Sequence, residues 1–401
     1  MVSELRCLRC GHEEAPSSRA YLCPRCEDRN PRDPGILDVR YDYDKVAEEV
    51  ARGGGWLQSR HDIFRFLPLL PVEAPGPVLP SGGTPLFAAP RLARRLGLRA
   101  LYLKDETRNP TRCLKDRATA VGLTRALQQE RKTVYCASAG NAAISLAGFS
   151  AHAGLECHAY VPRAASPERL QWLERYGART HISSGNYDQA FAESEEAGRE
   201  GGWYSRNCAY NPFLVEGKKT AALEVAEGLG WRAPDLLVAP VGDGCTLAAQ
   251  GKAFRELALL GLVESRPRLV GVQSAGVQPM VRMLQEWEGS DPSGVLSGDP
   301  PEAGTGGDAT GAAGTAAASM DVKTPRNARR LLAELRDVNG QVLAVEDDRM
   351  EEARSVLARE AGVVAELTSA AALAGLEDFL HADGGGRDRT AVVLVTGGRE
   401  S

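Results

Sequence analysis

Short apolar runs alternate with longer segments of helical periodicity along most of this chain. The apolar runs predict strands at 101–103, 134–136, 157–161, 236–241, 269–273, 342–345 and 391–395. The intervening periodicity predicts helices at 116–129, 142–152, 167–176, 247–260 and 347–361, preceded by a short helix at 44–52. Strands and helices that alternate over this length build parallel sheets covered by helices on both faces, so the pattern predicts an α/β fold.

Three segments interrupt the alternation. Residues 31–34 and 68–80 are rich in proline, which favours extended connections. Residues 303–319 contain no large apolar side chain. Such a segment cannot bury enough surface to order itself, so we expect a mobile loop there.

Length, charge and hydropathy limit the classes of protein to which this chain can belong. The 401 residues, of which 43% are hydrophobic, allow a large core and predict about two to three domains. The formal charge of -5 argues against a general nucleic-acid binder. The chain has no apolar run of about 18 residues and no apolar signal region near its start. We therefore expect a cytoplasmic protein with neither a membrane nor a nucleic acid as partner.

Four of the nine cysteines form two C-x-x-C pairs, Cys7 with Cys10 and Cys23 with Cys26. Two such knuckles fit tetrahedral coordination of zinc, and four thiolates leave no position open for a substrate. The pattern predicts a structural zinc ribbon over residues 1–34. The alternatives are two disulfides, which a reducing compartment disfavours, and a ribbon that has lost its metal. A nucleic-acid knuckle is less favoured, because acidic residues offset the local arginines.

One lysine is a candidate for chemistry. The chain has eight lysines against forty arginines, and Lys115 stands at the start of a predicted helix, in the segment 109–117. A guanidinium stays protonated, whereas a lysine amine can be neutral and can form a Schiff base. Taken alone, Lys115 is equally well explained as a surface lysine at a helix start.

Three loops follow three of the predicted strands, and ligands of open α/β sheets bind beyond the carboxyl ends of strands. The loop after 134–136 places a hydroxyl, a glycine and an amide at a helix start, which suits an anion; its residues are Ser138, Ala139, Gly140 and Asn141. The loop after 236–241 has two glycines at a helix start, which suits a phosphate; its residues are Gly242, Asp243, Gly244, Cys245 and Thr246. The carboxylate of Asp243 must point away from such a phosphate or pair elsewhere. Thr396, after 391–395, offers a hydroxyl to a heteroaromatic nitrogen.

Each of these loops, taken alone, is explained by an ordinary cap or turn. Together they supply an amine, an anion site, a phosphate cradle and a hydroxyl partner. This set meets the needs of pyridoxal phosphate, which requires an imine-forming lysine, a phosphate site and a partner for its pyridine nitrogen.

The motifs resemble, in their residues and in their order along the chain, those of fold-type II pyridoxal-phosphate enzymes. The likeness is specifically to the threonine synthase branch, in which a zinc ribbon also occurs. The resemblance rests on Ser81–Leu86, Lys104–Glu106, Asn109–Arg117, Ser138–Asn141, Glu216–Thr220, Gly242–Thr246, Thr324–Asn327 and Thr396–Gly397. It implies a catalytic domain over 35–401 with two three-layer, parallel-sheet subdomains and the cofactor between them. The smaller, mobile subdomain would span roughly 115–205, inserted in the larger one.

The resemblance also implies roles for the candidate residues. Lys115 would hold the cofactor covalently and remove the substrate α-proton. Asn141 would bind the cofactor's phenolic oxygen, and the loop from Ser138 to Ala142 would hold the substrate carboxylate. Gly242–Thr246 would bind the cofactor phosphate, and Thr396 would face the pyridine nitrogen. The implied protein is a lyase acting on a small amino acid, with O-phosphohomoserine to threonine as the leading reaction; a homodimer rests on the likeness alone.

The chain departs from the branch where the substrate phosphate would bind. The branch usually has Asn, Ser and Arg at the positions of Cys208, Ala209 and Leu214. Leucine in place of arginine removes the strongest type of phosphate ligand. Arg206, or arginines from the mobile loop, would then replace it. Otherwise the substrate differs, as in a threonine or serine dehydratase or a cysteate-synthase-like enzyme; a non-catalytic cofactor-binding sensor is a further alternative.

Overall fold

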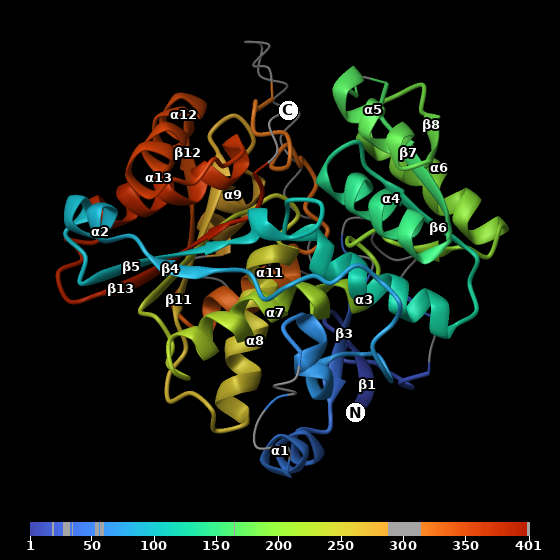
Figure 1. Ribbon diagram of the computed structural model, residues 1–401, viewed down its shortest axis with the longest axis horizontal. Coiled ribbons are helices and arrows are strands. Elements are labelled where there is room, and N and C mark those ends of the chain that lie inside the picture. Colours follow the sequence, from blue (N-terminus) through green and yellow to red (C-terminus); the bar gives the residue numbers. More distant parts are fainter. Residues whose placement is uncertain are drawn as a thin grey trace.

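The computed structural model describes residues 1–17, 20–26, 33, 35–52, 56, 60–163, 165–287 and 314–398. Apart from residue 33, the predicted linker at 31–34 lies outside these residues, as do positions 303–313 of the predicted mobile loop. Three separate sheets form within the described part (Figure 1).

The largest sheet has six strands in the order β12-β11-β10-β13-β5-β4. The strands are β4 (Leu86–Ala88), β5 (Ala100–Asp105), β10 (Leu236–Pro240), β11 (Arg268–Ser274), β12 (Gln341–Val345) and β13 (Thr390–Val395). All neighbouring pairs are parallel except β4 with β5. The sheet therefore joins residues near 100 to residues near 390 through the pair β5–β13.

Helices cover both faces of this sheet, which explains why its central strand β10 is apolar throughout. In β10, Leu236 and Val238 pack in one core cluster and Leu237 and Ala239 in another, as the alternation of side chains along a strand requires. The first cluster includes α2 (Pro90–Leu96), α12 (Asp347–Val356), the turn Leu357–Ala361 that continues it, and α13 (Leu367–Ala382). The second includes α1 (Tyr43–Arg52), α7 (Phe213–Gly228), α8 (Cys245–Leu259), α9 (Pro279–Trp287) and α11 (Ala328–Arg336).

A second, parallel sheet has four strands in the order β8-β7-β6-β9. They are β6 (Thr133–Ala137), β7 (Glu156–Val161), β8 (Arg179–Ile182) and β9 (Tyr204–Ser205). Its helices are α4 (Asn141–Ala153), α5 (Pro167–Arg175) and α6 (Tyr187–Glu200). Helix α3 (Lys115–Gln128) packs against both α4 and α7, so α3 and α7 lie between the two sheets (Figure 1).

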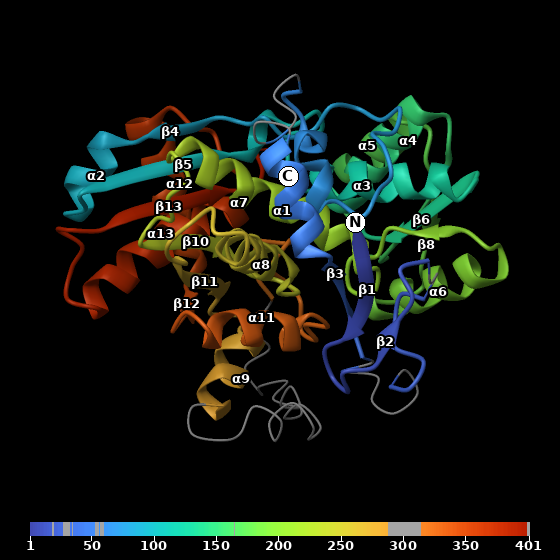
Figure 2. The same ribbon diagram turned by 90° about the horizontal axis from the view of Figure 1, so that it is seen from below.

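A small antiparallel sheet of order β2-β1-β3 carries the first cysteine pair. It consists of β1 (Val2–Cys7), β2 (Glu13–Glu14) and β3 (Leu37–Tyr41), so it extends past the ribbon boundary predicted at residue 34. The reason is that β3 is bound in the large core: Lys252 of α8 donates to Asp38 at 3.0 Å, and Tyr41 donates to Glu216 of α7 at 2.8 Å. Figure 2 shows β1 and β3 between α8 and α6.

The strands and helices predicted from the apolar pattern are all present within a few residues of their expected bounds. The prediction of an α/β fold with parallel sheets is confirmed. The pattern missed six of the described helices, namely α2, α6, α7, α9, α11 and α13. It also missed the strands β1, β2, β3, β4, β8 and β9 and the short 3-10 helices Ile63–Leu69 and Glu106–Arg108. How the chain divides into domains stays a prediction. Among the described helices, none combines the length and apolarity needed to cross a membrane.

Candidate active site

A cavity of about 710 Å³ lies beyond the carboxyl ends of β6 and β10, between the four-stranded and the six-stranded sheet. It brings together every residue that the sequence suggested for cofactor or substrate: Lys115, Ser138, Ala139, Gly140, Asn141, Ala142, Gly242, Asp243, Gly244, Cys245, Thr246 and Thr396. The placement of these residues is observed, while their individual roles stay predictions.

Lys115 is the first residue of α3 and lines the cavity. The backbone before Lys115 is fixed by two contacts. Leu114 N–H donates to the carbonyl of Thr396 at 2.8 Å, and Cys113 forms an antiparallel backbone β-bridge with Gly397. Within the described residues, Lys115 Nζ has no hydrogen-bond or ion-pair partner. Burial, and then the positive charge of Lys218, lower the pKa of Lys115 below its ordinary value. A larger share of the amine is therefore neutral, which is the state required of a nucleophile or a base.

The loop from Gly242 to Thr246 leads into α8, and no side chain caps that helix. A Cβ on Gly242 would lie 2.6 Å from the carbonyl oxygen of Ser319, and Gly244 has φ +94°, so both positions require glycine. The Asp243 carboxylate pairs elsewhere, as the sequence required: it accepts from Arg326 N–H and from Asn327 Nδ2, each at 2.6 Å. Burial raises the pKa of Asp243 to about 6. The backbone N–H groups at the helix start are thus left for an anion.

The loop from Ser138 to Ala142 leads into α4 in a similar way. The Ser138 hydroxyl accepts from Gly140 N–H at 3.1 Å, and no side chain caps the helix. Asn141 Nδ2 donates to Glu366 Oε2 at 2.8 Å. Glu366 is the residue just before α13 and lines the cavity. No sequence motif pointed to it, because the apolar pattern missed the helix that follows it.

Thr396 has a hydroxyl neighbour that the sequence also missed. Its Oγ1 lies 3.0 Å from the hydroxyl of Ser369, which also accepts from Gly397 N–H at 2.8 Å. The Ser369 hydroxyl has one proton, which either Thr396 or the Gly397 carbonyl can accept. Thr396 can therefore donate its own proton to a ligand whenever it does not donate that proton to Ser369.

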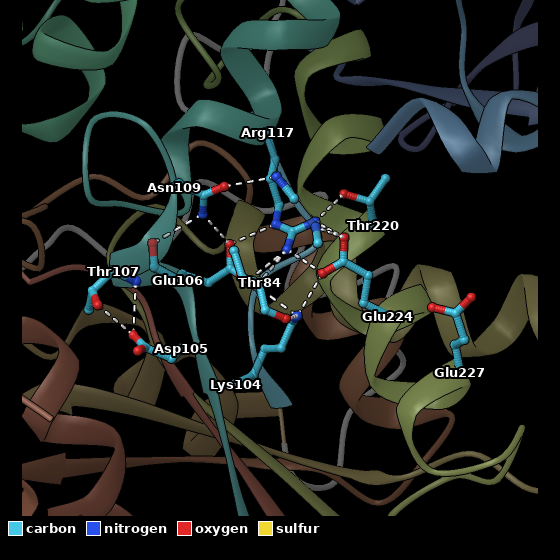
Figure 3. Close-up of polar contacts among 12 residues, drawn as sticks. Thr84, Lys104, Asp105, Glu106, Thr107, Asn109, Arg117, Thr220, Glu224 and Glu227 are labelled. Atoms are coloured by element: carbon cyan, nitrogen blue, oxygen red, sulfur yellow. Dashed lines mark hydrogen bonds and ion pairs between the residues drawn. The ribbon is translucent and has the colours of Figure 1, made fainter. Parts of the chain in front are cut away.

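A fully buried network of charges underlies the start of α3 (Figure 3). Arg117 Nε and Nη2 donate to Glu106 at 2.6 and 2.8 Å, and Arg117 Nη1 and Nη2 donate to Glu224 at 2.8 and 2.7 Å. Lys104 donates to Glu224 at 2.6 Å. Two cations thus face two carboxylates, so the cluster is neutral as a whole and its members satisfy one another.

The same network holds motifs from distant parts of the sequence. Thr84 and Asn109 Nδ2 each donate to Glu106 at 2.7 Å (Figure 3). Gly83 N–H donates to Glu224 at 2.8 Å. None of these residues lines the cavity. The motifs at 81–86, 104–106 and 109–117 therefore support the site, because they fix the first turn of α3 two residues after Lys115.

Two buried cations also line the cavity. Arg206 donates to the carbonyl of Lys115 at 3.2 Å and to Thr119 Oγ1 at 3.3 Å, and within the described residues no carboxylate pairs with it. Lys218 of α7 donates to Cys208 Sγ at 3.0 Å and to Cys245 Sγ at 2.7 Å. Cys208 and Ala209 line the cavity, whereas Leu214 is buried against Gly122 of α3 and does not.

The four N-terminal cysteines form one cluster. All four sulfur atoms lie within 4.8 Å of one another; the residues are Cys7, Cys10, Cys23 and Cys26. The sulfurs of Cys10 and Cys23 are 3.7 Å apart, close to the separation expected of two ligands on one tetrahedral zinc ion. Gly11 and Gly35, with φ of +72° and +83°, allow the turns that bring the pairs together.

A family model described as pyridoxal-phosphate dependent enzyme matches residues 79–397, which include Lys115, all three loops and the whole buried network. The chain therefore belongs to the family of pyridoxal-phosphate-dependent enzymes.

Within that family the chain is a lyase of the threonine synthase type. The threonine synthase of Methanosarcina acetivorans is 33% identical over 395 residues, covering 98% of this chain and 91% of that protein. The threonine synthase of Methanocaldococcus jannaschii is 32% identical over 396 residues, with the same coverage of 98% and 91%. The solved structure of maize serine racemase has the same fold, with a TM-score of 0.65 over 90% of this chain and 94% of its own, at 17% identity.

Proposed function

We propose that this enzyme performs elimination or replacement on a small amino acid, with the conversion of O-phosphohomoserine to threonine as the leading reaction. The observation that carries the proposal is the amine of Lys115, which has no partner among the described residues and lines one cavity with two helix starts that no side chain caps. An amine and two anion sites at this spacing suit an amino acid held beside a phosphorylated cofactor.

The residues fit pyridoxal phosphate. Lys115 would hold its aldehyde carbon, and the N–H groups of the loop from Gly242 to Thr246 would hold its phosphate, where a Cβ on Gly242 would block the approach. When bound, the cofactor supplies an electron sink for negative charge at the substrate carbon. Lys115, with its lowered pKa, would take the α-proton at its Nζ. The helix start after Ser138 would orient the substrate carboxylate.

Arg206 supports an anionic leaving group. It is a cation without a carboxylate partner among the described residues, and it lines the same cavity as Lys115. A buried cation favours a ligand that neutralises it. In this proposal Arg206 binds the anionic group of the substrate. Leu214 cannot do so, because it is buried away from the cavity.

The test is phosphate release with threonine formation from O-phosphohomoserine by the purified, cofactor-loaded enzyme. Arg206→Gln should lower kcat/KM about 10- to 100-fold, since a hydrogen bond to a charged group contributes about 1.5–3 kcal/mol. Arg163→Gln, at an exposed arginine outside the cavity lining, is the matched control and should leave kcat/KM unchanged. An unchanged kcat/KM in Arg206→Gln would contradict the role of Arg206.

The alternative is a related enzyme with another substrate, which Leu214 favours because it cannot bind a phosphate. No phosphate release by a protein that still binds the cofactor would select this alternative. Serine, threonine, phosphoserine and their acyl esters would then be compared. A spectral change on adding an amino acid, without turnover of any of them, would instead indicate a sensor.

We also propose that the four-cysteine cluster holds a structural zinc ion. Four thiolates suit zinc, and they leave no ligand position open for chemistry. Cys26→Ser should lower the zinc content, measured by elemental analysis, from one ion per chain to near zero. Because zinc binding is coupled to folding and is worth roughly 10–16 kcal/mol in isolated motifs, we also expect earlier thermal unfolding. Cys157→Ser, at a buried cysteine of β7, should keep the metal. Full zinc content in Cys26→Ser would contradict the site.

A further inference from the structure

Two cysteine sulfurs share one buried ammonium group at the wall of the cavity. Cys208 lies in the loop between β9 and α7, and Cys245 is the first residue of α8. Lys218 Nζ lies 3.0 Å from Cys208 Sγ and 2.7 Å from Cys245 Sγ. Because both sulfurs contact the same nitrogen, they lie at most 5.7 Å apart. Lys218 is 1% exposed, and its partners within the described residues are these sulfurs rather than a carboxylate.

Among the described residues only these two sulfurs can supply Lys218 with a negative charge, as a thiolate, and the surroundings favour Cys208 for it. The Cys245 side chain, followed by the charges of Lys218 and Arg206, holds the pKa of Cys208 well below its ordinary value despite burial. The Cys208 side chain and burial raise the pKa of Cys245, which favours its thiol form. A thiolate is the form of cysteine that reacts with oxidants and electrophiles, and Cys208 opens onto a cavity that small molecules can enter.

We propose that Cys208 is a site of oxidative modification, with Cys245 as the thiol that converts the oxidised form into a disulfide. Hydrogen peroxide accepts the electron pair of the Cys208 thiolate, its O–O bond breaks, and a sulfenic acid and hydroxide form. The Cys245 sulfur then attacks the Cys208 sulfur, an S–S bond forms, and the S–OH oxygen leaves as water with the Cys245 proton. A thiol reductant reverses the bond.

The disulfide would alter the site in two ways. It removes the negative charge that faces Lys218, which leaves an unpaired cation near Lys115. It also ties the loop at Cys208 to the first turn of α8, where the cofactor phosphate is proposed to bind. We therefore expect a loss of activity that a dithiol restores. This consequence rests on the proposed function, whereas the modification of Cys208 does not.

The test exposes the cofactor-loaded enzyme to hydrogen peroxide, blocks the remaining thiols and maps the peptides by mass spectrometry. A peptide pair joined through Cys208 and Cys245 is expected, and dithiothreitol should separate it. Iodoacetamide should label Cys208 at least about tenfold faster than Cys157, since each unit of pKa changes the thiolate fraction about tenfold. Labelling of Cys208 no faster than of Cys157 would overturn the proposal, as would oxidation of Cys208 without the Cys245 link.

Two variants separate the steps. Cys245→Ser should stop at the sulfenic acid, which dimedone traps at Cys208. Lys218→Met removes the ammonium and should slow iodoacetamide labelling of Cys208 about tenfold or more. Cys157→Ser is the matched control, because that cysteine is buried in β7 of the four-stranded sheet. This variant should leave the Cys208–Cys245 link intact. These experiments measure thiol labelling and peptide masses rather than turnover. They therefore test the modification of Cys208 even if the enzyme acts on a different amino acid.

Discussion

Lys115→Ala is expected to lose essentially all activity and the visible absorbance of a cofactor joined to a lysine amine. The variant removes both the covalent attachment and the base that lies in the cavity. A positioned base alone contributes roughly 10²–10⁴-fold, so we expect kcat to fall by at least about 10³-fold. Activity is measured as product formation and attachment as the absorbance of the dialysed protein.

Lys132→Ala is the matched control for this prediction. Lys132 is exposed, lies just before β6 and is not among the cavity-lining residues, so its loss should change neither activity nor absorbance. If Lys115→Ala kept the absorbance band after dialysis, the assignment of Lys115 would be wrong. Loss of the band in both variants would point to a general effect on folding, which circular dichroism would reveal.

Glu224→Gln is expected to lower the free energy of unfolding by about 3–5 kcal/mol. Glu224 is fully buried and accepts from Arg117, Lys104 and Gly83 N–H. Removal of its charge leaves two buried cations facing one carboxylate, and the loss of one partner from a buried ion pair typically costs this amount. Because the network fixes the first turn of α3, we also expect a lower affinity for the cofactor. Urea denaturation measures the first effect, and cofactor titration measures the second.

Glu227→Gln is the control, one turn further along α7. Glu227 is half-exposed and pairs with Arg65, so its loss should cost less than about 1 kcal/mol. In Figure 3 its side chain makes no contact with the network. Equal destabilisation by the two substitutions would contradict the special role of the buried cluster.

The pH dependence gives a second check on Glu224. Burial alone would raise its pKa, but the charges of Arg117 and Lys104 outweigh burial and hold the pKa below its ordinary value. A carboxylate with a depressed folded-state pKa contributes stability that is complete above the unfolded-state pKa of about 4.3 and is lost as the pH falls through the folded-state value. The stability gap between the wild type and Glu224→Gln should therefore be constant near neutral pH and should narrow in acid.

Much of the fold could be predicted because its central elements carry a clear periodicity. The strand at 236–241 is apolar at every position, and the helix at 116–129 follows a strand and a turn. Helices α7 and α13 were missed because they are buried on nearly all sides, so no polar face marks their period. Glu366 accepts from Asn141, and Ser369 contacts Thr396. Neither residue was predicted, because α13 was not predicted.

Those parts of the site that are local in sequence could be predicted, whereas contacts between distant residues could not. Local motifs identified the lysine and the loops, because glycines and helix starts leave a signal over a few residues. Cys208 was noticed only as a departure from a familiar pattern. Its partner Lys218 is ten residues away in sequence, and Cys245 is farther still, so their shared contact depends on how α7 and α8 pack. No spacing rule within one segment describes such a cluster.

The position of β13 has a consequence for the order of folding during synthesis. This strand lies between β10 and β5, and its residue Ala391 pairs with Leu101, so the six-stranded sheet cannot close until the ribosome has passed residue 395. The four-stranded sheet draws only on residues 133–205 and can form far earlier. Until β13 arrives, β5 has an unpaired apolar edge, which is the kind of surface that associates with other chains or with chaperones. The nascent chain is therefore most exposed to aggregation during the long interval in which one sheet is finished and the other is still open.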